Sequence, residues 1–426
     1  MQPTRTRFIV LSGLCGAAAL AYLTRNAVGT AESSIRADLG LTREQSGWAL
    51  SSFFWPYALC QIPAAALAQR LGARRALPLF AVLWSLSSAA FAAGSLGVMI
   101  GARVFMGVAQ AGLVPVGLSV MARWFPRTGQ GSASGGFSSF MSVGGILAGP
   151  LAAWLVISCG WRWMFALYAL PGLVWALWFA GWFRNFPAQH PSVNEAELNL
   201  IDPQVMPRAS AAPQRHPPVP WRQLLTSPAM GCICAQQFCR AAGYIFFASW
   251  FATYLQEARG VTILNSGWMT SLPLVADVTG CLVGGFLSDA VLRWTGSQRL
   301  ARQGISAIAL MLCAGLIFSA WLVGQPLLAV LVISAGMFCA AVANPCAAAT
   351  VMSIGGAHVA AVSGTMNMCG NFGAAAFPIV VPWLLHHAGG WNAVLLGFAG
   401  LHLVAAVFWL LLKTEGRVFG EVTAEG

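Results

Sequence analysis

Long apolar stretches separated by short polar segments are the feature that most limits what this 426-residue chain can fold into. A membrane span needs roughly 20 mostly apolar residues to cross about 30 Å of hydrocarbon. Each such stretch must be an α-helix, because lipid offers no partner to an open backbone N–H or C=O group. Twelve spans are predicted: 8–31, 47–69, 77–95, 97–122, 133–157, 163–183, 229–254, 264–288, 302–322, 327–352, 360–386 and 391–412.

The scarcity of charge supports this interpretation. Only 8% of the residues are charged and 58% are apolar, whereas a soluble domain carries about 25% charged residues. If this chain folded in water, its few charged residues could not cover the surface of a protein of this size. The composition therefore excludes a soluble enzyme, a nucleic-acid-binding domain and a disordered chain. We expect an all-α integral membrane protein whose surroundings are the lipid bilayer, with no nucleic-acid partner.

The basic residues indicate the orientation of the spans. The net charge is +11, and the arginines fall between the apolar runs rather than in one cluster. If the N-terminus is cytoplasmic, sixteen of the 23 basic residues fall on that side and four on the other. The positive-inside rule then places both termini in the cytoplasm. We expect a multi-pass protein of the plasma membrane, which in bacteria is the inner membrane.

One long polar segment divides the predicted spans into six and six. The predicted domains are an N-terminal six-helix bundle (1–183), a cytoplasmic linker (184–228) and a C-terminal six-helix bundle (229–426). A short amphipathic helix is predicted in the linker around Asn194–Ile201. Transporters built from such repeats bind their substrate near the midplane, between the halves.

A short loop element recurs after the second and the eighth predicted spans. Gln69, Arg70 and Arg74 belong to the first copy, and Asp289 belongs to the second. A carboxylate at a helix end can pair with an arginine and with a neighbouring helix N-terminus, and so hold one conformation closed. The first copy has no carboxylate, so its gate should be weaker by one ion pair. The alternative is that Arg70 and Arg74 only anchor the topology.

Short motifs spread over most of the chain resemble those of a known transporter family. In order, they are Tyr22-Leu-Thr-Arg25, Asp38-Leu-Gly-Leu41, Gln61-Ile-Pro63, Arg103-x-x-x-Gly107, Trp124-Phe-Pro126, Gly160-Trp-Arg-Trp-Met-Phe165, His190-Pro191, Phe238-Cys-Arg240, Tyr254-Leu, Gly284-Gly285 with Ser288-Asp289, Asn344-Pro345, and Gly364-Thr-Met-Asn367 with Gly370-Asn371. Together they resemble the anion:cation symporter family of the major facilitator superfamily, which includes bacterial sugar-acid and hexuronate transporters. The resemblance implies the major facilitator fold, with twelve transmembrane helices in two six-helix bundles.

Four ionisable residues lie inside predicted spans: Arg25, Arg103, Arg240 and Asp277. A charge inside the bilayer costs at least about 2.5–3.5 kcal/mol on insertion scales, so such residues are functional by default. Three cations against one acid favour an anionic substrate, which arginine binds in bidentate fashion. The resemblance implies that Arg25 holds the substrate carboxylate, that Arg103 serves proton coupling or interdomain packing, and that Arg240 binds substrate or helix ends. Snorkelling to the membrane surface is the alternative for Arg25 and Arg103.

Five uncharged polar residues complete the predicted binding site. The resemblance implies that Tyr57 lines the same cavity as Arg25, and Gln61 lies one turn later on the same helix face. Asn344, Asn367 and Asn371 fall inside spans ten and eleven, where their amides could bind substrate hydroxyls. The alternatives are packing for the tyrosine and interhelical hydrogen bonds for the amides.

Two departures from the family pattern concern coupling. Thr24 stands where many members have Asp, and Gln110 stands where many have Glu. Those two carboxylates carry protons in proton-coupled relatives, whereas threonine and glutamine cannot titrate at physiological pH. Asp277 is the one acid left inside a span. It is a candidate replacement proton site or cation ligand. The alternatives are a structural partner for Arg240 and an acid that serves helix packing.

These observations favour a secondary active transporter of a small organic anion, a sugar acid or another carboxylate, working by alternating access. Ion-coupled symport with a proton or cation is the main hypothesis. The alternatives are a facilitative uniporter, an organophosphate:phosphate antiporter or, from another class, a non-transporting membrane sensor. No catalytic or metal-binding spacing is visible, and the eleven cysteines lie in apolar runs. We therefore expect a monomer that is not an enzyme, with no metal and no cofactor.

Overall fold

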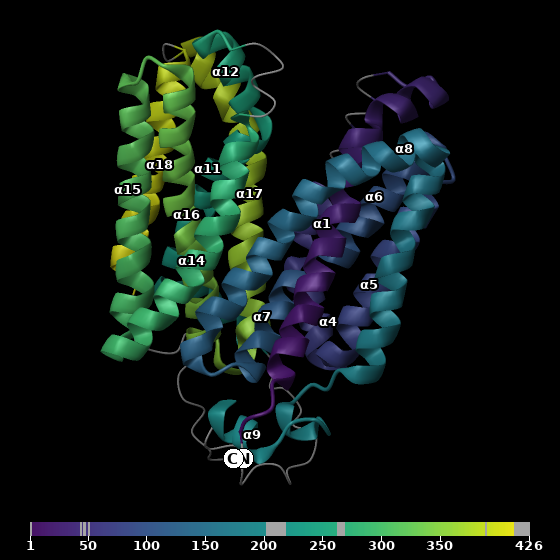
Figure 1. The fold of residues 1–426 in the computed structure, drawn as a ribbon, viewed down its shortest axis with the longest axis vertical. Coiled ribbons are helices and arrows are strands. Elements are labelled where there is room, and N and C mark those ends of the chain that lie inside the picture. Colours follow the sequence, from purple (N-terminus) through teal and green to yellow (C-terminus); the bar gives the residue numbers. More distant parts are fainter. Residues whose placement is uncertain are drawn as a thin grey trace. The chain divides into compact units, whose positions relative to one another are not determined.

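The computed structural model describes residues 2–42, 45, 48, 49, 52–201, 219–261, 269–387 and 390–412. Within these ranges the chain is helical and contains no strand (Figure 1). The chain divides into two compact units. Unit 1 contains Met1–Pro126, Phe140–Val219 and Ala357–Gly364, and unit 2 contains Arg127–Ser139, Pro220–Gly356 and Thr365–Gly426. The predicted linker is described up to residue 201 and from residue 219, so its central part, 202–218, lies outside the described residues.

Unit 1 contains the helices of the first half of the chain. They are α1 (Thr6–Leu39), α3 (Phe54–Leu59), α4 (Gln61–Leu71), α5 (Ala73–Phe91), α6 (Leu96–Gln110), α7 (Leu113–Trp124), the greater part of α8 (Gln130–Trp182), η2 (Pro187–Gln189) and α9 (Glu195–Ile201). Helix α8 contains both the fifth and the sixth predicted spans. It is broken at Gly160, whose φ of 83° and ψ of 160° are not helical. A backbone with positive φ is open to glycine at no steric cost.

Unit 2 contains the helices of the second half and the first turns of α8. They are η1 (Arg127–Gly129), α10 (Trp221–Thr226), α11 (Pro228–Ser249), α12 (Phe251–Arg259), α14 (Ser271–Thr295), the π-helical turn η4 (Arg299–Gly304), α15 (Ile305–Leu322), α16 (Pro326–Ile354), most of α17 (Val359–His387) and α18 (Trp391–Leu411). Proline opens α11 and α16, where its missing N–H costs nothing. Glycines in the left-handed region end α1 at Gly40 and α14 at Gly296.

Seven stretches of the described chain are long and apolar enough to cross a membrane. They are Thr6–Glu32, Leu96–Trp124, Arg127–Trp182, Ser271–Thr295, Arg299–Leu322, Pro326–Ile354 and Trp391–Leu411. The third has 56 residues, which is enough for two crossings at 1.5 Å per residue. Large apolar side chains such as Leu147, Ile157 and Leu312 are exposed on these helices, as expected of surfaces that face lipid. The chain is therefore a multi-pass membrane protein.

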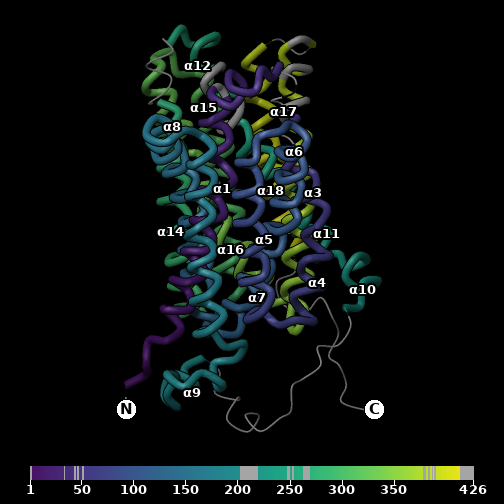
Figure 2. Tube along the Cα trace, turned by 90° about the vertical axis from the view of Figure 1, so that its right-hand side faces the viewer, coloured from purple at the N-terminus to yellow at the C-terminus, as the bar shows by residue number. Residues whose placement is uncertain are grey.

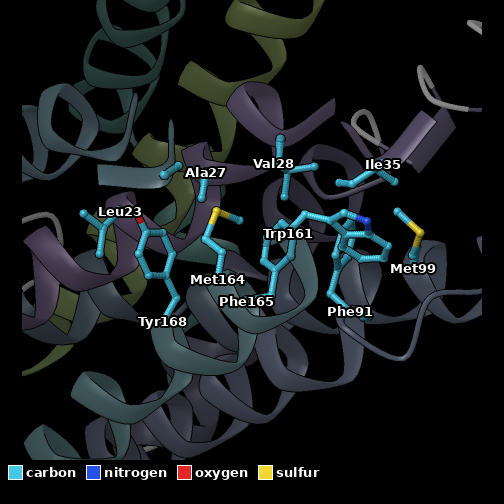
Figure 3. Close-up of a cluster of buried hydrophobic side chains, with 13 residues drawn as sticks. Leu23, Ala27, Val28, Ile35, Phe91, Met99, Trp161, Met164, Phe165 and Tyr168 are labelled. Atoms are coloured by element: carbon cyan, nitrogen blue, oxygen red, sulfur yellow. The ribbon is translucent and has the colours of Figure 1, made fainter. Parts of the chain in front are cut away.

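The core of unit 1 fixes the rotation of α1. One face of this helix, which carries Leu23, Ala27 and Val28, is buried against Met164 and Phe165 of α8, and Figure 3 shows these side chains interdigitating. The cluster also contains Ile35, Phe91, Met99, Trp161 and Tyr168. Burying each large apolar side chain contributes roughly 1.5–3 kcal/mol. The opposite face of α1 is thereby turned away from the core.

Both ends of α1 are held by polar contacts within unit 1. At its start, the Glu197 carboxylate of α9 accepts hydrogen bonds from the backbone N–H groups of Thr6 (3.2 Å) and Arg7 (3.1 Å) and from the Thr4 hydroxyl (2.5 Å). Glu197 is fully buried and also pairs with the Arg7 guanidinium at 3.2 Å. It caps a helix that has no side-chain cap of its own. Figure 2 shows α9 at the same end of the chain's fold as the N-terminus.

The segment before α9 adds further contacts to this end of unit 1. The Asn194 side chain accepts a hydrogen bond from the Thr4 N–H and donates one to the Gln2 carbonyl. His190 packs edge-on against Trp124 and Trp182. Burial, with the Arg184 guanidinium nearby, lowers the pKa of His190. The neutral ring therefore accepts the Ser192 N–H at Nδ1 (3.2 Å).

At its other end, α1 is held by Asp38. This carboxylate accepts a hydrogen bond from Trp161 Nε1 (3.2 Å) and pairs with the Arg162 guanidinium of α8. Two of the motifs quoted above, Asp38–Leu41 and Gly160–Phe165, are thus brought together in the fold.

Replacing Glu197 with alanine should destabilise the protein. The change leaves two backbone donors of α1 and the Arg7 guanidinium without their acceptor, which should lower the free energy of unfolding by about 2–4 kcal/mol. Glu195 is the matched control, because it lies on the same helix, carries the same charge and is exposed. Thermal unfolding of the purified full chain in detergent measures the difference. Equal melting temperatures for Glu197→Ala and Glu195→Ala would show that the cap does not stabilise α1.

Candidate functional site

Arg25 lies midway along α1, in contact with aromatic rings of unit 1. Its guanidinium carbon is 3.8 Å from the ring centroid of Tyr22 and 5.2 Å from the centroids of both Phe53 and Tyr57. Aromatic faces attract a cation without neutralising it. No carboxylate of the described chain lies within ion-pair distance of Arg25. The positive charge is therefore oriented by the protein and left available to an anion.

Tyr22 was noted in the first family motif but was not predicted as a binding residue, although it makes the shortest cation–ring contact with Arg25. Its position three residues before the arginine, one turn away on the same face, is the signal that could have identified it. Tyr57, which was predicted, is 5% exposed and stacks on Phe53 with 5.2 Å between ring centroids. Two phenols and one guanidinium are the hydrogen-bond donors that a carboxylate requires.

Arg103 of α6 donates a hydrogen bond to the backbone of Arg25. It is 2% exposed, its Nη1 donates to the Arg25 carbonyl oxygen (3.1 Å), and its guanidinium carbon is 4.9 Å from the Phe53 centroid. One aromatic ring thus contacts both cations. These contacts exclude snorkelling to the membrane surface for Arg103 in this conformation. They all lie within unit 1, so the predicted role in interdomain packing stays a prediction. A role of Arg103 in proton coupling stays a prediction.

The two positions that depart from the family pattern are in contact with each other. Gln110 Nε2 donates to the Thr24 hydroxyl (3.2 Å) and to the Ala21 carbonyl (3.1 Å). The Thr24 hydroxyl in turn bonds to the carbonyls of Leu20 and Ala21, each at 3.0 Å. Thr24 and Gln110 are 1% and 2% exposed. This buried pair is neutral and hydrogen-bonded, and neither side chain gains or loses a proton at physiological pH.

Gln61 follows Tyr57 by four residues but starts the next helix, α4. Its side chain is fully buried, and neither amide atom has a hydrogen-bond partner in the described part of the chain. A buried amide without partners costs about 1–3 kcal/mol. The start of α17 packs against the backbone at this position, since a Cβ on Gly364 would lie 3.2 Å from the backbone carbonyl oxygen of Gln61. Its predicted contact with substrate stays a prediction.

A second polar cluster lies in unit 2, around Arg240 of α11. Arg240 Nε donates to Gln237 Oε1 (3.3 Å). Asp277 of α14 and Arg240 both lie within electrostatic reach of the Cys281 thiol, which also accepts a hydrogen bond from Asn344 Nδ2 (3.7 Å). Asp277 is 8% exposed. The structure thus brings three of the predicted residues of unit 2, Arg240, Asp277 and Asn344, into one neighbourhood.

The two asparagines of α17 bond within their own helix. Asn371 Nδ2 donates to the Asn367 carbonyl (2.8 Å), while the Asn367 amide nitrogen is buried without a partner among the described residues. They share a face, as their spacing predicts. Contact of either side chain with substrate stays a prediction.

The second copy of the loop element forms a buried ion cluster in unit 2. Asp289 accepts hydrogen bonds from the N–H groups of Gly131 (3.0 Å) and Ser132 (2.6 Å), at the start of α8. The same carboxylate pairs with Arg302 at 3.2 Å, and their side chains are 0% and 4% exposed. The sequence predicted an arginine and a helix N-terminus as partners of Asp289, but it did not point to Arg302. The π-helical turn η4 carries this residue, and hydropathy gives no sign of such a turn.

The first copy of the element makes no such ion pair in the part of the chain that the structure describes. Arg70 is exposed, and Arg74 donates from its backbone to Asn185 Oδ1 (2.9 Å) and from its side chain to the Ala180 carbonyl (3.1 Å). Gln69 Nε2 is buried without a partner there. Arg74 thus contacts the end of α8 and the residues that follow it. A weaker gate in this half of the chain stays a prediction.

Comparison with known proteins shows the family. The family model of the Major Facilitator Superfamily matches residues 14–378. The chain is 29% identical to a probable sulfoacetate transporter of Cupriavidus necator, over 92% of this chain and 90% of the relative. It is 29% identical to a probable galactarate/D-glucarate transporter of Bacillus subtilis (96% and 92%) and 27% identical to a D-galactonate transporter of Escherichia coli (98% and 98%).

Solved structures show the same fold. The proton:xylose symporter XylE superimposes with a TM-score of 0.74 at 15% identity, covering 96% of each chain. The human organic anion transporter MFSD10 superimposes with a TM-score of 0.68 at 19% identity, covering 96% of this chain and all of that one. The all-helical architecture, the family model and these neighbours agree, and the chain belongs to the Major Facilitator Superfamily of membrane transporters.

Proposed function

We propose that this transporter moves a small carboxylate-bearing anion and that Arg25 binds the carboxylate. The observation that carries the proposal is the guanidinium of Arg25 among three aromatic rings, with no carboxylate of the described chain beside it. A desolvated cation that lacks a protein counter-ion favours an anionic ligand, and arginine fits a carboxylate in bidentate geometry.

The relatives support the same class of substrate. Their names describe transport of sulfoacetate, galactarate, D-glucarate and D-galactonate, all of which carry a carboxylate. The excess of arginine between the spans supports a place in the bacterial inner membrane with both termini in the cytoplasm. Uptake of radiolabelled anions from this panel into proteoliposomes tests the proposal, and failure to take up any of them would overturn it.

We further propose that unit 1 carries the anion without a proton. The Thr24–Gln110 pair supports this, because neither side chain titrates and each is hydrogen-bonded to the other. Asp277 is then the acid available inside a span for a coupled proton. Facilitated transport without coupling is the second candidate function, and the same neutral pair favours it.

Substrate-driven proton movement separates these two candidates. With a pH-sensitive dye trapped in proteoliposomes, coupled transport predicts acidification that Asp277→Asn abolishes and Thr24→Val leaves unchanged. Acidification that survives in Asp277→Asn would overturn the role of Asp277. A wild-type protein that takes up the anion without moving protons would establish facilitated transport instead.

A further inference from the structure

Beside Arg25, one face of α1 carries polar side chains that make no hydrogen bond to another described residue, namely those of Asn26 and Thr30. Tyr22, Arg25, Asn26, Gly29 and Thr30 form what we call the polar face of α1. At 100° per residue, Tyr22, Arg25, Asn26 and Gly29 fall on the side of the helix away from the core cluster, and Thr30 lies at the edge of this face, about 20° from Leu23. Asn26, Gly29 and Thr30 are exposed, whereas the neighbouring Ala27, Val28 and Ala31 are buried.

This face does not have the character of a surface in contact with lipid. Exposed positions on α8 carry Leu151, Trp154 and Ile157, whereas α1 exposes an amide, a hydroxyl and a glycine. A polar group placed in hydrocarbon without a hydrogen bond is costly. Asn26 and Thr30 have no hydrogen-bond partner among the described residues, so this face must border water or a polar ligand.

Thr30 differs in this respect from other membrane threonines of the chain. The Thr24 hydroxyl bonds to the carbonyls of Leu20 and Ala21, and the exposed Thr279 of α14 bonds to those of Val275 and Ala276. Such bonds within a helix use up the hydroxyl proton. The hydroxyl of Thr30 keeps both its donor and its acceptor capacity for another molecule.

Helix α8 leaves room beside both side chains. A Cβ on Gly145 would lie 3.0 Å from Asn26 Nδ2, and a Cβ on Gly149 would lie 3.9 Å from Thr30 Oγ1. The first distance is tighter than an ordinary contact, so any side chain at position 145 would displace the Asn26 amide. Glycine at this position keeps the amide accessible.

We propose that Asn26 and Thr30 determine specificity by hydrogen-bonding hydroxyl groups on the anion whose carboxylate Arg25 holds. This inference rests on the proposed function. Along the helix axis, Asn26 lies about 1.5 Å and Thr30 about 7.5 Å beyond Arg25, a spread that suits hydroxyls along a chain of several carbons. Amide and hydroxyl groups both donate and accept, as pairing with an alcohol requires. A site built for hydroxyls rejects an analogue that lacks them.

Two dianions of the same charge separate hydroxyl recognition from carboxylate recognition. D-glucarate carries several hydroxyl groups, and sulfoacetate carries none. In titrations of the purified full chain, Asn26→Leu should weaken D-glucarate binding at least tenfold and change sulfoacetate binding less than twofold. Thr30→Val should weaken D-glucarate binding several-fold. Thr279→Val is its matched control and should have no effect, because that hydroxyl already bonds to its own helix.

Gly145→Ala provides an independent test, because it leaves both polar residues in place. The added methyl group meets the end of a flexible side chain, so we expect an unchanged melting temperature and a loss of D-glucarate affinity similar to that of Asn26→Leu.

The binding measurements distinguish failure of the specificity proposal from failure of the proposed function. Equal losses for both anions in Asn26→Leu would overturn the proposal. A wild-type protein that binds sulfoacetate but not D-glucarate would also overturn it, while the proposed function stands. Binding of neither anion, together with no uptake, would overturn both.

Discussion

Arg25→Ala should reduce anion uptake by at least about 100-fold. The Arg25 guanidinium can neutralise and chelate a carboxylate, and the three rings around it carry no charge. The neighbouring Arg103 donates to the Arg25 carbonyl, so it does not replace Arg25 in this role. Losing a charge-assisted bidentate contact costs about 3 kcal/mol or more, and each 1.4 kcal/mol is a factor of ten. Arg25→Lys keeps the charge without the planar fork and should recover only part of the rate. Initial uptake rates in proteoliposomes, normalised to the amount of folded protein, give the comparison.

Arg36→Ala is the control for this experiment. Arg36 lies on the same helix, three turns later, is partly exposed and pairs with Glu32 at 3.0 Å. An exposed pair of this kind is worth about 0.3–0.5 kcal/mol, so its loss should leave uptake and stability nearly unchanged. If Arg25→Ala transports as well as Arg36→Ala, the carboxylate is not held at Arg25.

Asp289→Ala should destabilise unit 2 by about 3–5 kcal/mol. The change leaves the Arg302 guanidinium buried without its counter-ion and removes the acceptor of two N–H groups at the start of α8. Removing one partner of a buried pair costs more than the pair contributes, because the remaining charge stays desolvated. The melting temperature of the detergent-solubilised protein should fall sharply.

The double variant Asp289→Ala with Arg302→Met should recover part of that loss, because it removes the stranded charge and keeps the apolar volume. Glu32→Ala breaks the partly exposed pair with Arg36 and is the matched control. A melting temperature for Asp289→Ala equal to that of Glu32→Ala would contradict the assignment of Asp289 as the acceptor at the start of α8.

The positions of the helices could be predicted from the sequence because hydrocarbon imposes both their length and their secondary structure. Breaks inside an apolar run could not be predicted in this way. At Cys60, the chain passes from α3 to α4 without any change in polarity. The break of α8 at Gly160, in contrast, falls in the gap between the fifth and sixth predicted spans, 133–157 and 163–183.

The candidate site was predictable where a single residue is unusual in its surroundings. Arg25 is such a residue, since a cation inside a span is itself a signal. Tyr22 and Asn26 are ordinary residues, and their roles depend on which way α1 is rotated. The core cluster fixes that rotation. Glu197 and Arg302 act through partners on other helices, and no spacing within one segment indicates such pairings.

The contacts at the two ends of α1 have a mechanical consequence. The contacts of Glu197 at the first turn and of Asp38 at the last turn oppose sliding of α1 along its axis. Glu197 contributes more, because it is buried, whereas Asp38 and Arg162 are 44% and 49% exposed. We therefore expect that a movement of α1 caused by anion binding at Arg25 also moves α9 at one end of the helix and the Gly160 bend of α8 at the other.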